Sequence, residues 1–418
     1  MKILKLPPYY SPEQVASSHL TNDVNEAFVQ AGFTIENYVP SPSRGVSKEV
    51  RKQYKKIRYE ENANGKIIVH RFPVFAERKN TLLRAFRYLL VNLKQYRRGV
   101  KAKNVDVIYA GSTPPTQGVL CAKVKKKLSK KVGKTVPFVY VLQDIFPDSL
   151  VSAKMTKKGS LLWKIGRKIE DYTYRNADVI VTLSEDFRRN IMEKGVPEDK
   201  IVIIPNWVNT ENVFPVSRSE NKLFQNLKLD PSLFYVCYSG NIGHSQNMEL
   251  LLDVAESIYP RMPNVRFVLI GEGAAKEAIA ETIQEKQIKN VQLFPFQDYS
   301  IIEQVFSLGD VGLIISKAGV GTSSVPSKTW SIMAAERPIL ASFDGQSELA
   351  KIIASTKCGV VAEAGSKEEL ISGIQYLYEE KEERLKMGAR GKAYLEEHLS
   401  KEKCIQAYVD VVNSVITE

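Results

Sequence analysis

Residues 315–343 read ISKAGVGTSSVPSKTWSIMAAERPILASF and carry the pattern that decides the fold. An apolar run at Val311–Ile315 precedes a loop rich in glycine and serine, and a short amphipathic segment opens at Pro326-Ser327-Lys328. A proline break and a second apolar run follow, so the pattern predicts strand, loop, helix and strand. In a parallel sheet, such a unit directs unpaired N–H groups, the positive end of a helix and the Lys328 ammonium at a ligand above the strand ends. The stretch therefore predicts a phosphate-binding site.

Length and composition indicate a globular protein with two domains. A chain of 418 residues is too long for one ordinary core, and two domains of roughly 200 residues each are expected. The composition, 44% hydrophobic and 25% charged, is typical of soluble globular proteins. No run approaches the roughly 18 apolar residues of a spanning helix, and the N-terminus reads as a strand and a turn rather than a signal peptide. These features predict a cytoplasmic protein.

The four cysteines are scattered along the chain, without any Cys-x-x-Cys pair. This argues against a zinc site or a disulfide framework and fits a reducing compartment.

The net charge of +12 is distributed unevenly. Residues 1–200 contain 38 Lys and Arg against 19 Asp and Glu, so residues 201–418 carry a net charge of −7. A basic half suits nucleic acid, an anionic membrane surface or an anionic substrate. No zinc finger or aromatic-rich RNA-binding strand is recognisable, so we do not expect a nucleic-acid partner.

The first 205 residues alternate between strand and helix patterns, as a doubly wound sheet does. A strand, a helix ended by Gly32 and another strand open the chain as β-α-β. Ligands of such sheets bind above the carboxyl ends of the strands, next to the loop that follows the first strand. Ser17 and His19 are therefore candidate acceptor or cleft residues, although His19 could equally be an ordinary helix residue.

Basic residues interleave with the apolar residues of two predicted helices. In the first helix, the apolar residues recur at helical spacing: Leu82, Leu83, Phe86, Leu89, Leu90, Leu93 and Tyr96. Two interpretations stay open: a domain helix with one face in the core, or a basic amphipathic helix on an anionic membrane. The second helix adds six lysines between Lys123 and Lys131, and the polar segment 44–61 is expected to be a mobile excursion.

Asp144 is the best candidate for acid/base or positioning chemistry in the first half. It follows the strongly β-forming run Pro137–Leu142, and catalytic groups of such sheets lie at strand ends. The alternative is an aspartate that caps the next helix.

The second half restarts the alternation and places glycine-bearing loops after its strands. Gly240–Gln246 follows one strand, and Gly271-Glu272-Gly273 follows the next. The dinucleotide fingerprint is incomplete because Lys276 replaces its third glycine. An amphipathic closing helix at residues 403–416 could return to the first domain.

Several motifs together resemble the family 4 glycosyltransferases, which have the GT-B architecture of two Rossmann-like domains. They are FVLIGEG at 267–273, NVQLF at 290–294, LGDVGLI at 308–314, PSKTWSIMAAERP at 326–338 and IPNWVN at 204–209. QDIFPD at 143–148, GNIG at 240–243 and the Pro-Ser-Lys resemble the branch typified by fucosamine transferases of bacterial O-antigen and capsule synthesis. The resemblance covers nearly the whole chain.

Some positions depart from the family pattern. Ser323 and Ser331 stand where the family carries two glutamates that hold the donor ribose and sugar, and Asn241 and Gln246 stand where it has diphosphate-binding Arg and Lys. More of the positive charge must then come from Lys328, with Lys317 as a second candidate. The family's glycine-rich N-terminal loop is also replaced, at residues 15–17.

The resemblance implies a retaining transfer from a nucleotide sugar, most simply a UDP-sugar, to an acceptor hydroxyl. Residues 1–205, with a helix at about 400–418, would bind the acceptor, and residues 206–399 the donor. No Asp-x-Asp occurs, so neither a metal nor another cofactor is expected. Lys328 and Asp144 are the expected catalytic residues, and the donor-binding residues are Gly240, Asn241, Gln246, Glu272, Pro326, Ser327, Lys328 and, at the uracil edge, the backbone around Phe294.

The basic first half suits a polyprenyl-diphosphate-linked glycan acceptor at the inner face of the membrane, because lipid and linker are both anionic. The expected location is cytoplasmic and peripheral to that membrane. Alternatives are a UDP-sugar 2-epimerase of the same fold and a non-catalytic nucleotide-sugar-binding protein. A dinucleotide oxidoreductase is disfavoured by the incomplete fingerprint.

Overall fold

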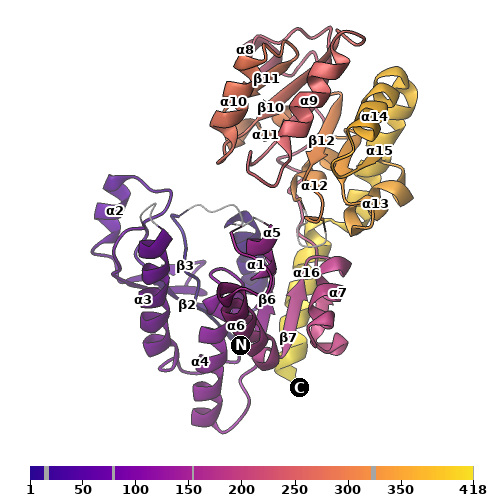
Figure 1. Cartoon of the computed structure of the whole chain (residues 1–418). Helices are drawn as coiled ribbons and strands as arrows, with labels where there is room; N and C mark the ends of the chain where they lie inside the picture. Colours follow the sequence, from indigo (N-terminus) through magenta and orange to yellow (C-terminus); the bar gives the residue numbers. More distant parts are fainter. Residues whose placement is uncertain (14–17, 78–80, 153–154, 322–325, 418) are drawn as a thin grey trace. The chain divides into compact units, whose positions relative to one another are not determined.

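The computed structural model describes residues 1–13, 18–77, 81–152, 155–321 and 326–417. It divides into two compact units (Figure 1): residues 1–205 with 402–418 form unit 1, and residues 206–401 form unit 2. Each unit is an α/β fold built around one sheet, so the prediction of two Rossmann-like domains is confirmed.

The sheet of unit 1 has the strand order β3-β4-β2-β1-β5-β6-β7-β8. Every neighbouring pair is parallel except β3, which runs antiparallel to β4. The strands are β1 (Lys2–Lys5), β2 (Thr34–Pro40), β3 (Tyr59–Asn62), β4 (Ile67–Phe72), β5 (Val107–Gly111), β6 (Phe138–Val141), β7 (Val179–Thr182) and β8 (Ile201–Ile203). Strand β6 lies between β5 and β7, and its β-forming residues are buried on both faces of the sheet because helices cover both sides.

Helices cover both faces of this sheet. Helix α4 packs between α3 and α6. On the other face, Phe28 of α1 and Tyr408 of α16 both contact Tyr109 of β5. The helices of unit 1 are α1 (Ser18–Gln30), α2 (Lys48–Tyr54), α3 (Thr81–Gly99), α4 (Thr116–Val132), α5 (Asp148–Ser152), α6 (Leu161–Asn176), α7 (Glu185–Glu193) and α16 (Lys401–Thr417).

Residues 44–61, expected to form a mobile excursion, contain regular secondary structure. Helix α2 and strand β3 occupy much of this segment, and β3 pairs with β4 and forms the edge of the sheet. The strand is polar because it lies at the sheet edge, where most of its side chains are exposed.

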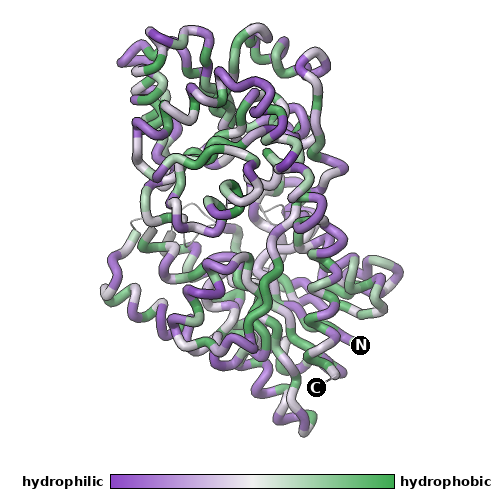
Figure 2. Tube along the Cα trace, turned by 90° about the vertical axis from the view of Figure 1, so that its right-hand side faces the viewer, coloured by the Kyte–Doolittle hydropathy of each residue, from purple (hydrophilic) through white to green (hydrophobic). Residues whose placement is uncertain are grey.

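The sheet of unit 2 is entirely parallel, in the order β11-β10-β9-β12-β13-β14. Its strands are β9 (Phe234–Ser239), β10 (Val265–Ile270), β11 (Val291–Phe294), β12 (Val311–Ile315), β13 (Ile339–Phe343) and β14 (Gly359–Glu363). The helices are α8 (Leu223–Asn226), α9 (Met248–Ile258), α10 (Lys276–Glu285), α11 (Ile302–Phe306), α12 (Lys328–Ala334), α13 (Glu348–Thr356), α14 (Lys367–Glu379) and α15 (Lys381–His398). Figure 2 shows hydrophobic and hydrophilic stretches alternating along the trace, and the strands of unit 2 are largely buried.

Helix α3 exposes its apolar side chains. Between 39% and 56% of the surface is exposed at Leu83, Phe86, Leu89 and Leu93. These four side chains do not lie in the core. The interpretation of α3 as a domain helix with its apolar face in the core is therefore wrong for these residues.

Polar residues of α3 face the interior and explain this orientation. Gln95 is fully buried, and its amide donates to the carbonyl oxygens of Leu6 (2.8 Å), Pro7 (2.9 Å) and Tyr38 (2.9 Å). Arg87 is also fully buried and donates to the Ser43 hydroxyl at 3.0 Å. Since buried donors require partners, these bonds set which side of α3 packs on the sheet.

Candidate functional site

The predicted donor residues lie at one edge of the unit 2 sheet. Strands β10, β9 and β12 are neighbours and parallel, so the loops that follow them emerge at the same carboxyl edge. These loops and the start of α12 carry Gly240, Asn241, Gln246, Glu272, Pro326, Ser327 and Lys328, while Phe294 ends the adjacent β11. The fold therefore gathers side chains that are up to 88 positions apart in the sequence.

Lys328 is the charged group of this edge. Its ammonium lies 3.6 Å from the centre of the Tyr238 ring, and the Tyr238 hydroxyl donates to the Asn241 carbonyl at 2.6 Å. Among the described residues, no acceptor or carboxylate bonds to the Lys328 ammonium. Burial lowers the pKa of Lys328 to about 7. A half-buried cation without a counter-ion provides a binding site for an anion.

Helix α12 contributes less to this site than the sequence predicts. It has seven residues and begins at Lys328. The amides of Thr329 and Trp330 already donate to the carbonyls of Pro326 (2.9 Å) and Ser327 (3.2 Å), so they are not unpaired. The positive charge of the site therefore comes mainly from the Lys328 side chain.

The glycines of the neighbouring loops allow close packing. A Cβ atom on Gly271 would lie 1.9 Å from the Gly240 carbonyl oxygen, and one on Gly273 would lie 2.2 Å from the Ile242 carbonyl oxygen. A Cβ atom on Gly240 would lie 2.8 Å from the Lys328 ammonium nitrogen. The Gly-x-Gly pattern thus brings the loops after β9 and β10 together around the lysine.

Two other candidates already make contacts within the protein. The Gln246 side chain accepts the Gly243 amide at 3.0 Å and so shapes its own loop. The Glu272 carboxylate forms an ion pair with Lys276 at 2.6 Å on the exposed surface. Any contact that Glu272 makes with a donor must compete with this pair.

Phe294 also has part of its backbone occupied. Its carbonyl accepts the Gly271 amide at 3.0 Å. Two residues later the Phe296 ring is 53% exposed, which leaves a free aromatic surface beside the strand end.

Asp344 was not among the sequence candidates. It follows β13, and its carboxylate accepts the amides of Gly319 (2.9 Å) and Gly321 (2.6 Å) in the loop before α12. Its place directly after an apolar strand is the signal that could have identified it. Asp344 is a positioning residue for the loop that leads to Lys328.

The remaining predicted residues of unit 2 add no free charge. Ser323 lies outside the described residues. Ser331 is half-buried on α12, and its carbonyl accepts the Ala335 amide at 3.0 Å. Lys317 lies 3.7 Å from the Glu249 carboxylate, so its charge is already paired.

In unit 1, Asp144 lies in the loop that follows β6. The Ser112 hydroxyl accepts the amides of Gln143 (3.1 Å) and Asp144 (3.3 Å) and holds this loop against the end of β5. Neighbouring atoms shield the carboxyl from water and raise its pKa, although the residue remains partly exposed. Helix α5 begins four residues later, and the Asp144 carboxylate accepts no amide among the described residues. The interpretation of Asp144 as a helix cap is therefore wrong.

Of the two candidate acceptor residues, Ser17 lies outside the described residues, and His19 is exposed at the start of α1. The part of the chain that the structure describes contains no cluster of three or more His, Cys, Asp and Glu side chains able to hold a metal ion.

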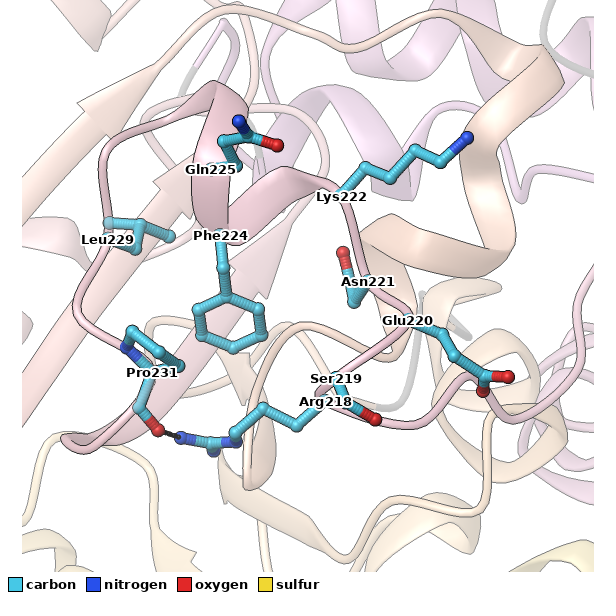
Figure 3. A pocket seen from close by; sticks show the side chains of 9 residues that line it. All are labelled: Arg218, Ser219, Glu220, Asn221, Lys222, Phe224, Gln225, Leu229 and Pro231. Atoms are coloured by element: carbon cyan, nitrogen blue, oxygen red, sulfur yellow. Dashed lines mark hydrogen bonds between the residues drawn. The ribbon is translucent and has the colours of Figure 1, made fainter.

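The hollow shown in Figure 3 belongs to the opposite edge of the unit 2 sheet. Arg218, one of its lining residues, donates to the Pro231 carbonyl at 2.8 Å and pairs with Asp310 at 2.5 Å, just before β9 and β12 begin. Since substrates of such sheets bind at the carboxyl ends of the strands, this hollow is not the candidate site.

Comparison with known proteins identifies the class. Residues 20–212 match the model "Glycosyltransferase Family 4", and residues 219–394 match "Glycosyl transferases group 1". The structure of Anabaena Alr3699/HepE in complex with UDP superposes with a TM-score of 0.72 at 15% identity, covering 99% of this chain and 100% of that chain. At this identity the likeness shows the fold alone. The protein is thus a GT-B glycosyltransferase, an enzyme that transfers sugars.

Two curated relatives agree with the family. The colanic acid biosynthesis glycosyl transferase WcaI, so named in Escherichia coli (strain K12), is 25% identical over 386 residues, which cover 90% of this chain and 91% of WcaI. The glycosyltransferase WbjE, so named in Pseudomonas aeruginosa, is 28% identical over 280 residues, 66% of each chain. The chain belongs to the family 4 glycosyltransferases.

Proposed function

We propose that this enzyme transfers a sugar, with retention of its anomeric configuration and without a metal, from a UDP-sugar to a lipid-linked glycan during surface polysaccharide synthesis. The observation that carries the donor half is the Lys328 ammonium, held over Tyr238 without a counter-ion. The relative WcaI, named for colanic acid biosynthesis, and the UDP complex of a structural neighbour support the pathway class and the nucleotide.

Lys328 would act on the leaving group. Negative charge grows on the departing UDP as the glycosidic bond breaks, and no other free cation of the described donor edge is available to meet it. A charge-assisted contact contributes roughly 1.5–3 kcal/mol. Such a contact accelerates the reaction when it is stronger in the transition state, where the charge develops, than in the complex with bound donor. The Lys328 ammonium would therefore stabilise the transition state more than the bound donor.

Asp144 would position the acceptor hydroxyl. Its carboxyl group is exposed in the loop after β6, and the Ser112 hydroxyl fixes that loop. A raised pKa favours a carboxyl that accepts a proton or a hydrogen bond near neutral pH. This assigns the acceptor to unit 1 and the donor to unit 2.

The outward face of α3 would bind an anionic membrane. Exposed Phe86, Leu89 and Leu93 supply apolar surface, and the neighbouring α4 exposes Lys123, Lys126, Lys127, Lys130 and Lys131. An apolar helix face beside basic residues is typical of helices that lie in the membrane interface. In the described ranges, none of the helices has the length and apolar character needed to cross a bilayer. Enzyme mixed with anionic vesicles should co-float at low salt and release at high salt; recovery only in the unbound fraction would contradict this part.

A thermal-shift screen of nucleotide sugars tests the donor half. UDP-sugars should raise the melting temperature, equally well with EDTA present, because a ligand that binds only the folded state stabilises it by about 2.7 kcal/mol at a concentration of 100 Kd. The selected sugar should then be hydrolysed slowly or transferred, with release of UDP. An unchanged melting temperature with every nucleotide sugar would overturn the proposal, and release of free UDP-sugar epimer without transfer would favour an epimerase.

A further inference from the structure

A second exposed apolar surface lies at the start of α6. Leu161 is 77% exposed, Leu162 is 50% exposed and Ile165 is 48% exposed. These three residues, named here the α6 ledge, occupy little more than one helical turn. The hydroxyl of Ser160 accepts the Trp163 amide at 3.2 Å and caps this turn, so the ledge is built on an ordered helix end.

Polar contacts on the inner face of α6 hold the ledge outward. Glu170 is buried and forms ion pairs with Arg167 and, at 3.0 Å, with Lys194 just after α7, and it accepts the Tyr174 hydroxyl at 2.6 Å. Lys194 also pairs with Asp148 of α5 at 2.7 Å. Rotating α6 to bury its leucines would break this buried network, which is strongly unfavourable.

The ledge adjoins the loop that carries Asp144. A Cβ atom on Gly166 would lie 2.7 Å from Cβ of Pro147 and 2.9 Å from the ring of Phe146. Helix α6 therefore packs directly on this loop, one residue after the ledge ends. The ledge therefore lies on the helix that packs against the loop carrying Asp144.

Cations surround the ledge. Lys157 and Lys158 precede it, and Lys164 and Lys168 flank it on the helix, all with exposed side chains. Within the described ranges, none of these four ammonium groups forms an ion pair. The surface thus offers apolar contact and positive charge within a few residues of each other.

We infer that the α6 ledge binds the first isoprenyl or acyl units of the acceptor lipid, with the flanking lysines on its anionic linker. This inference rests on the proposed function and names the part of the acceptor that unit 1 recognises. The positive charge of the lysines complements an anionic linker, and α6 packs on the loop that carries Asp144. Three apolar side chains on about one helical turn are also a small surface, which suits a single lipid chain better than the flat surface of a bilayer. The bilayer is assigned to the longer stripe of α3.

Binding of farnesyl diphosphate tests the ledge directly. With saturating UDP present to occupy the donor site, the fluorescence of Trp163 is titrated with farnesyl diphosphate and with inorganic diphosphate. Wild-type protein should bind the isoprenyl compound at least tenfold more tightly. Leu161→Gln combined with Ile165→Gln should remove this preference, and Trp163→Phe should remove the signal.

The matched control is Leu89→Gln combined with Leu93→Gln on α3, which should keep the preference but weaken vesicle binding. An unchanged preference in the ledge variant, or its equal loss in the α3 variant, would overturn the inference. Leu161→Gln alone provides the test if the double variant unfolds. Thermal stabilisation by UDP is measured on wild-type protein and on every variant. Absence of this stabilisation in wild-type protein would contradict the proposed function. A ledge variant that is still stabilised by UDP but no longer prefers farnesyl diphosphate would support the inference about the ledge.

Discussion

Helices α3 and α9 are both amphipathic, yet they pack in opposite senses. Helix α9 buries Leu251, Leu252 and Val254 against its sheet, whereas α3 exposes Leu89 and Leu93. The periodicity of apolar residues predicted α3 correctly but did not indicate which of its faces is buried. That choice depends on partners distant in the sequence, and in unit 1 it leaves apolar surface available for ligands.

The same contrast separates the roles of the two units. In unit 2 the apolar residues of helices such as α9 lie in the core, and the candidate site is one cation among glycine-bearing loops. Unit 1 carries most of the basic residues and exposes apolar side chains on α3 and α6. These surfaces fit an enzyme whose donor is a water-soluble nucleotide sugar and whose acceptor is an amphiphile.

The largest difference in stability is expected between truncation of a leucine in α9 and truncation of a leucine in α3. Leu252→Ala in α9 should lower the free energy of unfolding by about 2–5 kcal/mol, because the leucine is 1% exposed in the unit 2 core. Leu89→Ala in α3 should change it by no more than about 0.5 kcal/mol, since 56% of that residue is exposed. Urea unfolding followed by circular dichroism measures both; equal losses would contradict the inverted packing of α3.

Gln95→Leu asks whether polar contacts set the orientation of α3. A leucine there would extend the apolar periodicity, but it would leave the carbonyls of Leu6, Pro7 and Tyr38 without the Gln95 donor. The expected loss is about 1–3 kcal/mol of unfolding free energy. Gln95→Glu keeps the shape of the side chain but also removes the amide donor, so it compares loss of the donor without added apolar character. A stabilised leucine variant would mean that the amide does not direct the packing.

The affinity for UDP should fall as pH rises above 7. Burial lowers the pKa of the free Lys328 ammonium to about 7, and a bound diphosphate favours its charged form, so binding takes up a proton above that pH. Between pH 7 and 8.5 the dissociation constant should rise by up to about tenfold per unit. Calorimetry in two buffers of different ionisation enthalpy measures the proton uptake, and Lys328→Met should abolish it.

The same shift has a consequence for the free protein. Between pH 7 and 10.5 the unfolded chain holds more protons on this lysine than the folded one, so its contribution makes stability increase with pH. A pH-independent UDP affinity in wild type would contradict the role of Lys328 as the counter-ion.

The smallest effect is expected at Glu336, which has a left-handed backbone with φ of 56° after α12. Glu336→Gly relieves this strain but loses an exposed ion pair with Lys392 at 3.4 Å, so a gain below about 1 kcal/mol is expected. Glu336→Ala loses the pair and keeps the strain. Thermal unfolding should rank glycine above alanine, and the reverse order would rule out strain at this position.

The sequence predicted the apolar strands, the two-domain fold and the loops of the donor edge because apolar runs ended by glycine or proline are local signals, but it did not predict the polar edge strand β3. It also placed Lys328 at the start of a helix and Asp144 just after a strand, as the structure has them. It did not predict that the Thr329 and Trp330 amides are already paired, or that Asp344 holds the loop before α12, because these contacts depend on the three-dimensional course of the loops. The sequence left the orientation of α3 open for the same reason.

The turnover of the Lys328→Ala variant tests the central claim most directly. With the UDP-sugar selected by the thermal-shift screen, kcat should fall about a hundredfold or more while KM changes much less, because the lysine meets charge that develops in the transition state. Lys289→Ala, an exposed lysine before β11, is the matched control and should leave both constants unchanged. An unchanged kcat with only a raised KM would contradict the account.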